Sequence, residues 1–173
     1  SGAGATSGGA AGNSGAITSP TGPFMPGPCA DLFADDLFPT YELQIAPAEW
    51  NALVNDFNTM QQNIDAGRNY HPYHALAEFR YGDEVVRNAL IRLKGWSSWR
   101  QAVNDKPAKM QFVIAFNEID GNGRFHGQRK LELDMPRIDQ TYVRQRIALA
   151  YMRAVGLPAQ CANNARVFIN GAY

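Results

Sequence analysis

The sequence predicts an α+β domain in which a mainly antiparallel sheet packs with one long helix. Several segments alternate apolar and polar residues with the period of a strand, and a segment near the C-terminus repeats with the period of a helix. Glycine, proline and asparagine stand between these segments, as they do at turns. A sheet with one long helix lying between strands has the composition of an α+β lobe.

The chain of 173 residues divides near residue 28. Residues 1–28 consist almost entirely of Ser, Gly, Ala, Thr and Pro, and their large apolar side chains are Ile17, Phe24 and Met25. Because so little apolar surface cannot offset the entropy lost on ordering, we expect a disordered tether here. Residues 29–173 are long enough for one folded domain, which needs roughly 100 to 150 residues.

The first predicted strand and helix follow each other directly. Residues 40–45 alternate, which predicts a half-buried strand, and Pro47 suits the first turn of a helix. The apolar residues of this helix recur at the spacing i, i+3, i+4, i+7 that makes one stripe. They are Trp50, Leu53, Val54 and Phe57. Residues 58–74 are polar and aperiodic, which predicts a long loop.

A hairpin and two further strands are predicted next. Residues 75–81 and 85–93 both alternate, with Gly82 and Asp83 as the turn between them. Residues 110–116 and 130–134 also show the period of a strand. These segments supply most of the predicted sheet.

The clearest predicted helix spans residues 140–155. Asp139 can cap its N-terminus, and Gly156 and Pro158 end it. We expect the exposed face of this helix to be basic. Its arginines there are Arg144, Arg146 and Arg153.

The last predicted strand, residues 165–169, leads into Asn170-Gly171, a strong signal for a two-residue hairpin turn. Such a turn is useful only if another strand pairs with the first. Only Ala172 and Tyr173 follow in the sequence, so we expect the domain to be truncated.

Charge and hydropathy argue against two classes of partner. Sixteen basic and sixteen acidic residues give formal neutrality, which does not predict a broad surface for nucleic acid. No apolar run approaches the roughly 20 residues that span a bilayer. We therefore expect neither nucleic acid nor a membrane span.

The two cysteines, Cys29 and Cys161, leave two alternatives. In an oxidising compartment they form a disulfide that ties the start of the domain to its last strand; otherwise they are two unrelated thiols. A Ser/Gly/Ala-rich tether ahead of a domain is common in exported bacterial proteins, where it separates the domain from the envelope. We expect an extracellular or cell-envelope location, with the N-terminal segment as the tether.

A lysine near a glycine- and serine-containing segment is a candidate for phosphate binding. Lys109 stands at the start of a predicted strand, shortly after the segment GWSSW. Its ammonium group, with hydroxyl and backbone N–H donors from that segment, suits a nucleotide. GWSSW is neither a Walker motif nor a kinase glycine loop, so a surface lysine beside a turn with two packed tryptophans is the alternative.

Six blocks of the chain are distinctive as an ordered set. They are YELQIAPAEWNAL, RLKGWSSW, KMQFVIAF, FHGQRKLELD, YVRQRIALAYMRAVGLPA and ARVFINGAY. This set resembles the CotH-type kinases, a family named for a bacterial spore-coat protein. The resemblance runs from about Tyr41 to Tyr173, and it implies the N-terminal lobe of a minimal, atypical protein-kinase fold.

The resemblance implies a site for ATP. Lys109 is the residue that would contact the phosphates, with Gly95, Ser97 and Ser98 in the preceding loop. Arg144 would lie on the counterpart of the kinase helix that orients the lysine.

Two departures from the usual kinase pattern accompany this site. Family members often carry Asn where this chain has Trp96. In the predicted helix, Gln145 offers no carboxylate to Lys109, so Glu132 and Asp134 are the candidate partners of the lysine.

The resemblance also implies a function and an alternative to it. It implies an exported atypical kinase that transfers the ATP γ-phosphate to Ser or Thr of secreted or coat proteins, with Mg²⁺ or Mn²⁺. The aspartates that hold the metal lie in a later part of the family, so no residue of this chain is assigned a catalytic or metal-binding role. Because some relatives resemble coat components or invasins, a non-catalytic surface structural or adhesion protein with a kinase-like fold is the alternative.

Overall fold

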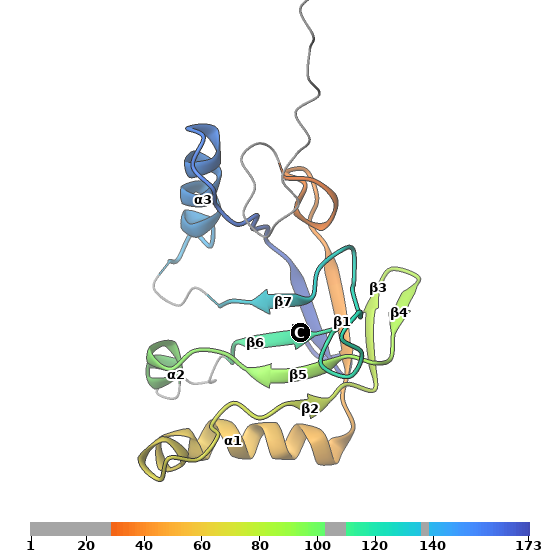
Figure 1. Cartoon of the computed structure of the whole chain (residues 1–173), viewed down its shortest axis with the longest axis vertical. Coiled ribbons are helices and arrows are strands. Elements are labelled where there is room, and N and C mark those ends of the chain that lie inside the picture. Colours follow the sequence, from red (N-terminus) through yellow and green to blue (C-terminus); the bar gives the residue numbers. More distant parts are fainter. Residues whose placement is uncertain (1–28, 103–109, 136–138) are drawn as a thin grey trace, which may run out of the picture.

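The structure, a computed structural model, describes residues 29–102, 110–135 and 139–173 (Figure 1). The expected tether, residues 1–28, lies outside the described residues, and so does Lys109. Both therefore stay predictions from the sequence.

The described residues form two four-stranded sheets and three α-helices (Figure 1). In chain order the elements are η1 (Asp31–Phe33), β1 (Thr40–Gln44), α1 (Pro47–Asp65), β2 (His74–Ala75), β3 (Glu78–Tyr81), β4 (Glu84–Val86), β5 (Leu90–Leu93), α2 (Ser97–Ala102), β6 (Phe112–Ala115), β7 (Lys130–Leu133), α3 (Arg144–Ala154) and β8 (Arg166–Ile169). One sheet has the order β4-β3-β1-β8 and the other β2-β5-β6-β7. The α+β class is confirmed, with two sheets in place of the one expected.

The strand pairs between these elements are antiparallel except for β1 and β8, which run parallel with Tyr41 opposite Val167. The expectation of a mainly antiparallel arrangement of strands is therefore confirmed. The expectation of one long helix near the C-terminus is wrong, because α1 with 19 residues is longer than α3 with 11.

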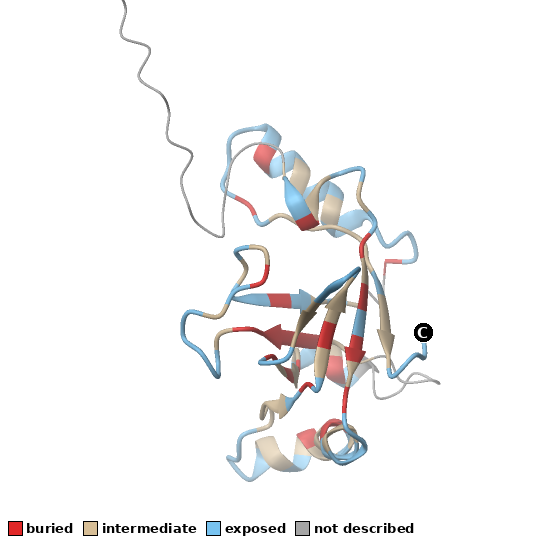
Figure 2. Ribbon diagram, turned by 90° about the vertical axis from the view of Figure 1, so that its right-hand side faces the viewer, coloured by how far each residue is buried: buried red, intermediate tan, exposed pale blue. Residues whose placement is uncertain are grey.

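The core lies where the two sheets meet. Residues from both sheets belong to one buried cluster, and Leu43, Phe79, Ile91 and Ile114 have no exposed surface. The ring of Phe79 from the first sheet meets the ring of Phe116, which directly follows β6, at 5.2 Å in an edge-to-face arrangement. In Figure 1 the strands of the two sheets cross steeply, and Figure 2 shows the buried residues concentrated along them. Such crossed packing lets the two inner faces share one core.

Helix α1 is longer than the sequence predicted. Leu53 and Phe57 of its expected stripe are buried, and the stripe continues through buried Met60 to partly buried Ile64. These positions keep the i, i+3, i+4, i+7 spacing through the segment that we expected to be a loop. The predicted loop over residues 58–74 is therefore wrong for its first half, because tertiary packing retains an otherwise polar segment in the helix.

The predicted hairpin of residues 75–93 is divided between the sheets. Strands β3 and β4 form a hairpin around Gly82, whose φ of +56° suits a glycine turn. By contrast, β2 and β5 pair with each other in the second sheet. The chain changes sheet next to β2, where Ala77 N donates to Gln44 O of β1. Alternation marked the strands correctly but could not show that they belong to different sheets.

Helix α3 begins at Arg144, later than predicted, and Asp139 caps it from a distance. The Oδ2 atom of Asp139 accepts a hydrogen bond from Arg144 N at 2.8 Å, while Oδ1 accepts from Thr141 N and Oγ1. These hydrogen bonds lower the pKa of Asp139, with the Thr141 hydroxyl as the largest cause. The predicted basic face is wrong for Arg153, which is buried and donates to the Gln160 carbonyl.

Two bridges fix the start of the described chain to the segment after α3. Cys29 and Cys161 form a disulfide across 132 residues of sequence, which decides between the two alternatives left open by the sequence. Asn163 Nδ2 also donates to the carbonyls of Ala34 and Leu37. The segment around η1 is thereby held against the domain, with Leu32 buried in its core.

The turn predicted at Asn170-Gly171 is present. Both residues have positive φ, and Ile169 forms a bridge with Ala172. The side chain of Asn170 accepts from Ile45 N at 2.8 Å and donates to Ile45 O at 3.0 Å. It therefore continues the ladder between β8 and β1 where the backbone of β8 turns away.

His126 joins the loop between β6 and β7 of the second sheet to η1 and to β4 of the first sheet. Its Nδ1 lies 2.7 Å from Asp31 and its Nε2 lies 2.9 Å from Glu84. Burial alone would lower the pKa of His126, but the hydrogen bonds to the two carboxylates outweigh burial and raise it. Since both ring nitrogens face acceptors, the charged form suits this position.

Candidate functional site

A lysine at the end of the second sheet lies between two carboxylates. Lys94 directly follows β5, and its Nζ lies 2.6 Å from Glu132 Oε2 and 2.5 Å from Asp134 Oδ1. The strand register explains this contact: Lys94 N donates to Gln111 O next to β6, and β6 in turn pairs with β7. The two acids alternate with Leu133, so they project from the same face of β7.

The two carboxylates keep Lys94 charged. Burial alone would lower the pKa of Lys94, but its hydrogen bonds to Asp134 and Glu132 outweigh burial and raise that pKa. The side chain of Lys94 is 24% exposed and that of Glu132 is 53% exposed, so solvent and a ligand can reach the pair. The site therefore presents an oriented ammonium group at the surface.

Gly95 follows this lysine in a conformation that favours glycine. Its φ is +82°, and a Cβ atom placed on it would lie 2.0 Å from Ser98 Oγ. Its carbonyl lies 2.9 Å from His71 Nε2, and a carbonyl can only accept, so Nε2 carries the proton. Burial lowers the pKa of His71, so the imidazole is neutral near pH 7. The turn is thus fixed by its own geometry and by a histidine from the segment after α1.

The GWSSW segment is a turn followed by helix α2, where the sequence predicted only a loop. Trp99 is 7% exposed, its Nε1–H donates to the Phe57 carbonyl of α1 at 2.7 Å, and its ring meets the ring of Phe57 edge to face. Trp96 is exposed, with the guanidinium of Arg100 over its ring. The expectation of two packed tryptophans is therefore wrong for Trp96 and confirmed for Trp99, which anchors α2 to α1.

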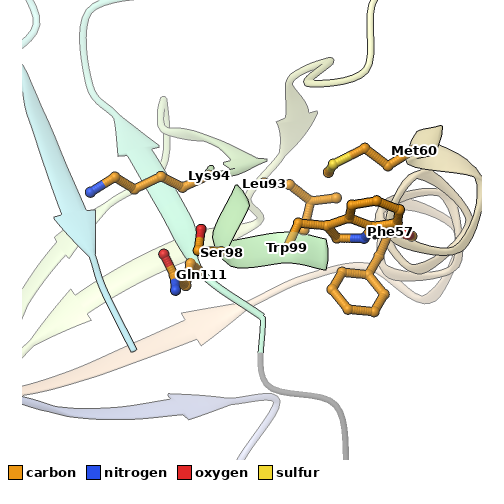
Figure 3. A pocket seen from close by; sticks show the side chains of 7 residues that line it. All are labelled: Phe57, Met60, Leu93, Lys94, Ser98, Trp99 and Gln111. Carbon is orange, nitrogen blue, oxygen red and sulfur yellow. Dashed lines mark hydrogen bonds between the residues drawn. The ribbon is translucent and has the colours of Figure 1, made fainter. Parts of the chain in front are cut away.

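A small crevice connects this anchor to the lysine (Figure 3). It is lined by Phe57, Met60, Leu93, Lys94, Ser98, Trp99 and Gln111. In Figure 3 the Ser98 and Gln111 side chains lie next to each other on the polar side, with the Trp99 ring on the apolar side. The crevice thus combines hydroxyl, amide and ammonium groups with an aromatic wall.

We expect Trp99→Phe to lower the free energy of unfolding by about 1–2 kcal/mol, because it removes a buried hydrogen bond and part of an aromatic contact. Trp96→Phe is the matched control, and because Trp96 is exposed its loss should stay below about 1 kcal/mol. Denaturant unfolding followed by circular dichroism measures both. Equal losses in the two variants would contradict the role given to Trp99.

The structure brings together some of the residues predicted from the sequence. Gly95 and Ser98 lie beside Lys94, and Ser97 begins α2. Arg144 instead lines a separate hollow on α3, so it does not join this crevice. The role of Lys109 stays a prediction, since that residue lies outside the described residues.

Lys94 is the residue that reasoning from the sequence missed. Glu132 and Asp134 were expected as partners of Lys109, whereas the structure places both on Lys94. The register of the three strands β5, β6 and β7 places Lys94 beside these acids. When residues 90–93 are paired with 112–115, and these with 130–133, Lys94 comes level with Gln111 and Asp134. Only correct pairing of the three strands would have shown it.

Fold and site together define an α+β protein whose second sheet ends in an acid-bound lysine beside a glycine turn. The family model described as CotH kinase protein matches residues 91–173. This part of the chain is therefore similar to the CotH kinase family, and the resemblance seen in the sequence is confirmed there. The match begins at Ile91, after the strand–helix block that opens the resemblance.

No curated protein and no solved structure matches the chain. The CotH kinase family implies the use of ATP and metal in general. Within the described ranges, no helix is long and apolar enough to cross a bilayer. Within the same ranges, no group of three or more His, Cys, Asp or Glu side chains is arranged to hold a metal ion.

Proposed function

We propose that the chain forms the nucleotide-binding part of an exported, atypical CotH-type protein kinase, which transfers the ATP γ-phosphate to Ser or Thr of secreted or coat proteins. The observation that carries this proposal is Lys94, held by Glu132 and Asp134 next to the Gly95 turn inside the segment that matches the family. The disulfide supports export, because disulfides persist in oxidising compartments.

The lysine–acid contact has a counterpart in protein kinases. There, a lysine paired with a glutamate contacts the ATP phosphates, and the pair must be in place for transfer. Lys94 is held in the same way by Asp134 and Glu132, with the Ser98 hydroxyl on the same crevice. We assign Lys94 and Ser98 to the phosphates, together with Gly95 and Ser97 of the turn.

The net charge of the Lys94 site shows that binding of ATP requires further positive charge. One ammonium group beside two carboxylates leaves a local charge of about −1, which repels a triphosphate unless further positive charge is near. Lys109 is the candidate within the same matched segment, and Mg²⁺ or Mn²⁺ supplies the remaining charge neutralisation in this kind of chemistry. The described residues supply hydrogen-bond donors for the phosphates but no group of three acidic, histidine or cysteine side chains for a metal ion, so we place the metal ligands outside them.

The proposal predicts that Lys94→Met weakens ATP binding about 10- to 100-fold, because a hydrogen bond to a charged group contributes about 1.5–3 kcal/mol. Isothermal titration of the full chain with ATP and Mg²⁺ measures this change. Lys130→Met is the matched control, since Lys130 also pairs with an acid, Glu118, but stands at the other end of β7.

Three results would overturn the assignment of Lys94. One is an equal loss of ATP affinity in both lysine variants. Another is an equal loss of affinity for adenosine, which lacks the phosphates that Lys94 is proposed to contact. The third is unchanged binding of ATP in Lys94→Met. If the wild-type chain does not bind ATP at all, the non-catalytic structural or adhesion protein is the better interpretation.

A further inference from the structure

Helix α3 presents its large apolar side chains to solvent. Ile147 and Tyr151 stand about one turn apart on α3, and Val143 and Val155 flank its two ends. Together they form a slanted row of exposed apolar side chains, which we call the α3 stripe. Ile147 is 62% exposed and Tyr151 is 68% exposed. With Ala148 between them they form the wall of a shallow, mainly apolar hollow.

The opposite side of α3 packs on the domain through charged residues. Arg153 is 6% exposed and donates to the Gln160 carbonyl, and Arg146 donates to the Asp35 carbonyl and carboxylate. An ordinary surface helix does the reverse, with apolar residues inward and charged residues outward. An exposed apolar surface of this kind marks a place where another segment binds.

The residues that precede the described chain begin beside this helix. Cys29 is bonded to Cys161, with their Cα atoms 5.8 Å apart, and Cys161 directly follows the Gln160 that Arg153 contacts. Asp35, six residues after Cys29, is bound by Arg146. The start of the described chain is thus fixed to the inner side of α3.

The N-terminal segment can reach the α3 stripe from this point. Phe24 stands five residues before Cys29, and an extended chain spans about 3.3–3.6 Å per residue, so Phe24 reaches about 17 Å from the disulfide. A helix with its side chains is about 10–12 Å across, so the path around half of it is of similar length.

We propose that residues 20–28 dock on the α3 stripe of the same chain, with Phe24 and Met25 as the apolar anchors. The disulfide holds the segment next to its binding surface, and a short connection of this kind gives a millimolar effective concentration. A weak apolar contact is then sufficient for occupancy. In this arrangement the N-terminal segment covers the exposed side of α3.

Photo-crosslinking of the full chain tests this proposal without any nucleotide, so its outcome is independent of the proposed function. Phe24 is replaced by p-benzoylphenylalanine, and the control carries the same probe at Ala10, well before the proline-containing segment. We expect crosslinks within one chain from position 24 to residues 143–155. The combined change Ile147→Ser and Tyr151→Ser should reduce their yield about tenfold, since burial of one large apolar side chain contributes at least that much affinity.

Four outcomes would overturn the proposal. Crosslinks between two chains would mean that a second copy covers the α3 stripe. Crosslinks from position 24 to other elements, or equal yields from positions 24 and 10, would mean that the segment does not dock. An unchanged yield in the serine variant would mean that the stripe is not the binding surface; because Ile147 and Tyr151 are exposed, circular dichroism should show that this variant keeps its fold.

Discussion

Replacing both cysteines, Cys29→Ser with Cys161→Ser, should lower the free energy of unfolding by about 4–5 kcal/mol, one of the two largest effects that we expect for this protein. The disulfide closes a loop over 132 residues of sequence, nearly the whole described domain. A cross-link over so long a loop removes much of the entropy of the unfolded chain. Since single domains are stable by about 5–15 kcal/mol, this loss is a large part of the total.

Denaturant unfolding without reductant measures the difference between the wild-type protein and the double variant. Reductant added to the wild-type protein should produce the same loss, while the double variant should not respond to it. This second comparison separates the disulfide from any local effect of the serine side chains. Equal stability of the two proteins under oxidising conditions would contradict the role of the disulfide.

Lys109→Ala should reduce ATP-dependent labelling of a Ser- or Thr-containing substrate about 100-fold or more in the full-length protein. Removing one group that stabilises the developing charge of a transition state typically costs about 100- to 1,000-fold in rate. The expectation follows from the charges around Lys94. Its ammonium group carries one positive charge and its two carboxylate partners carry two negative charges, so a second lysine is needed beside the phosphates.

Lys106 provides the matched control for this prediction, because it has the same charge and lies three residues away in the same segment. Lys106→Ala should keep most of the labelling. The unfolding transitions of both variants should match that of the wild-type protein, which would exclude a loss of fold. If both changes abolish labelling equally, or if neither does, the specific role of Lys109 is wrong.

The regular spacing of apolar residues predicted those elements in which burial of one face is visible in the sequence of the element itself. The strands near residues 40–45, 110–116 and 130–134 and the stripe of the first helix were correct because burial of one face imposes a fixed spacing on the sequence. The same reasoning failed for residues 58–65, where a polar sequence stays helical because Met60 and Ile64 pack on the core. It also failed for the 75–93 hairpin, since alternation carries no information about which sheet a strand joins.

The candidate site also contains residues that the sequence predicted and residues that only the structure revealed. The glycine and serines of GWSSW were singled out from the sequence, and Gly95 and Ser98 do lie beside a lysine. That lysine is Lys94, however, because its partners Glu132 and Asp134 are about 40 residues away and reach it only through three strands in register. Contacts across such separations depend on strand pairing, which spacing along the chain does not encode.

By itself the sequence determined the α+β class, the position of most elements, the similarity of residues 91–173 to the CotH kinase family and the two thiols that could pair. Each of these depends on residues that are neighbours in the chain or on their order. The tertiary structure alone decided the parallel pairing of β8 with β1, the disulfide, the acid-bound Lys94 and the outward apolar side of α3. The physical reason is that these features arise from contacts between distant segments, and their energies depend on which surfaces the fold brings together.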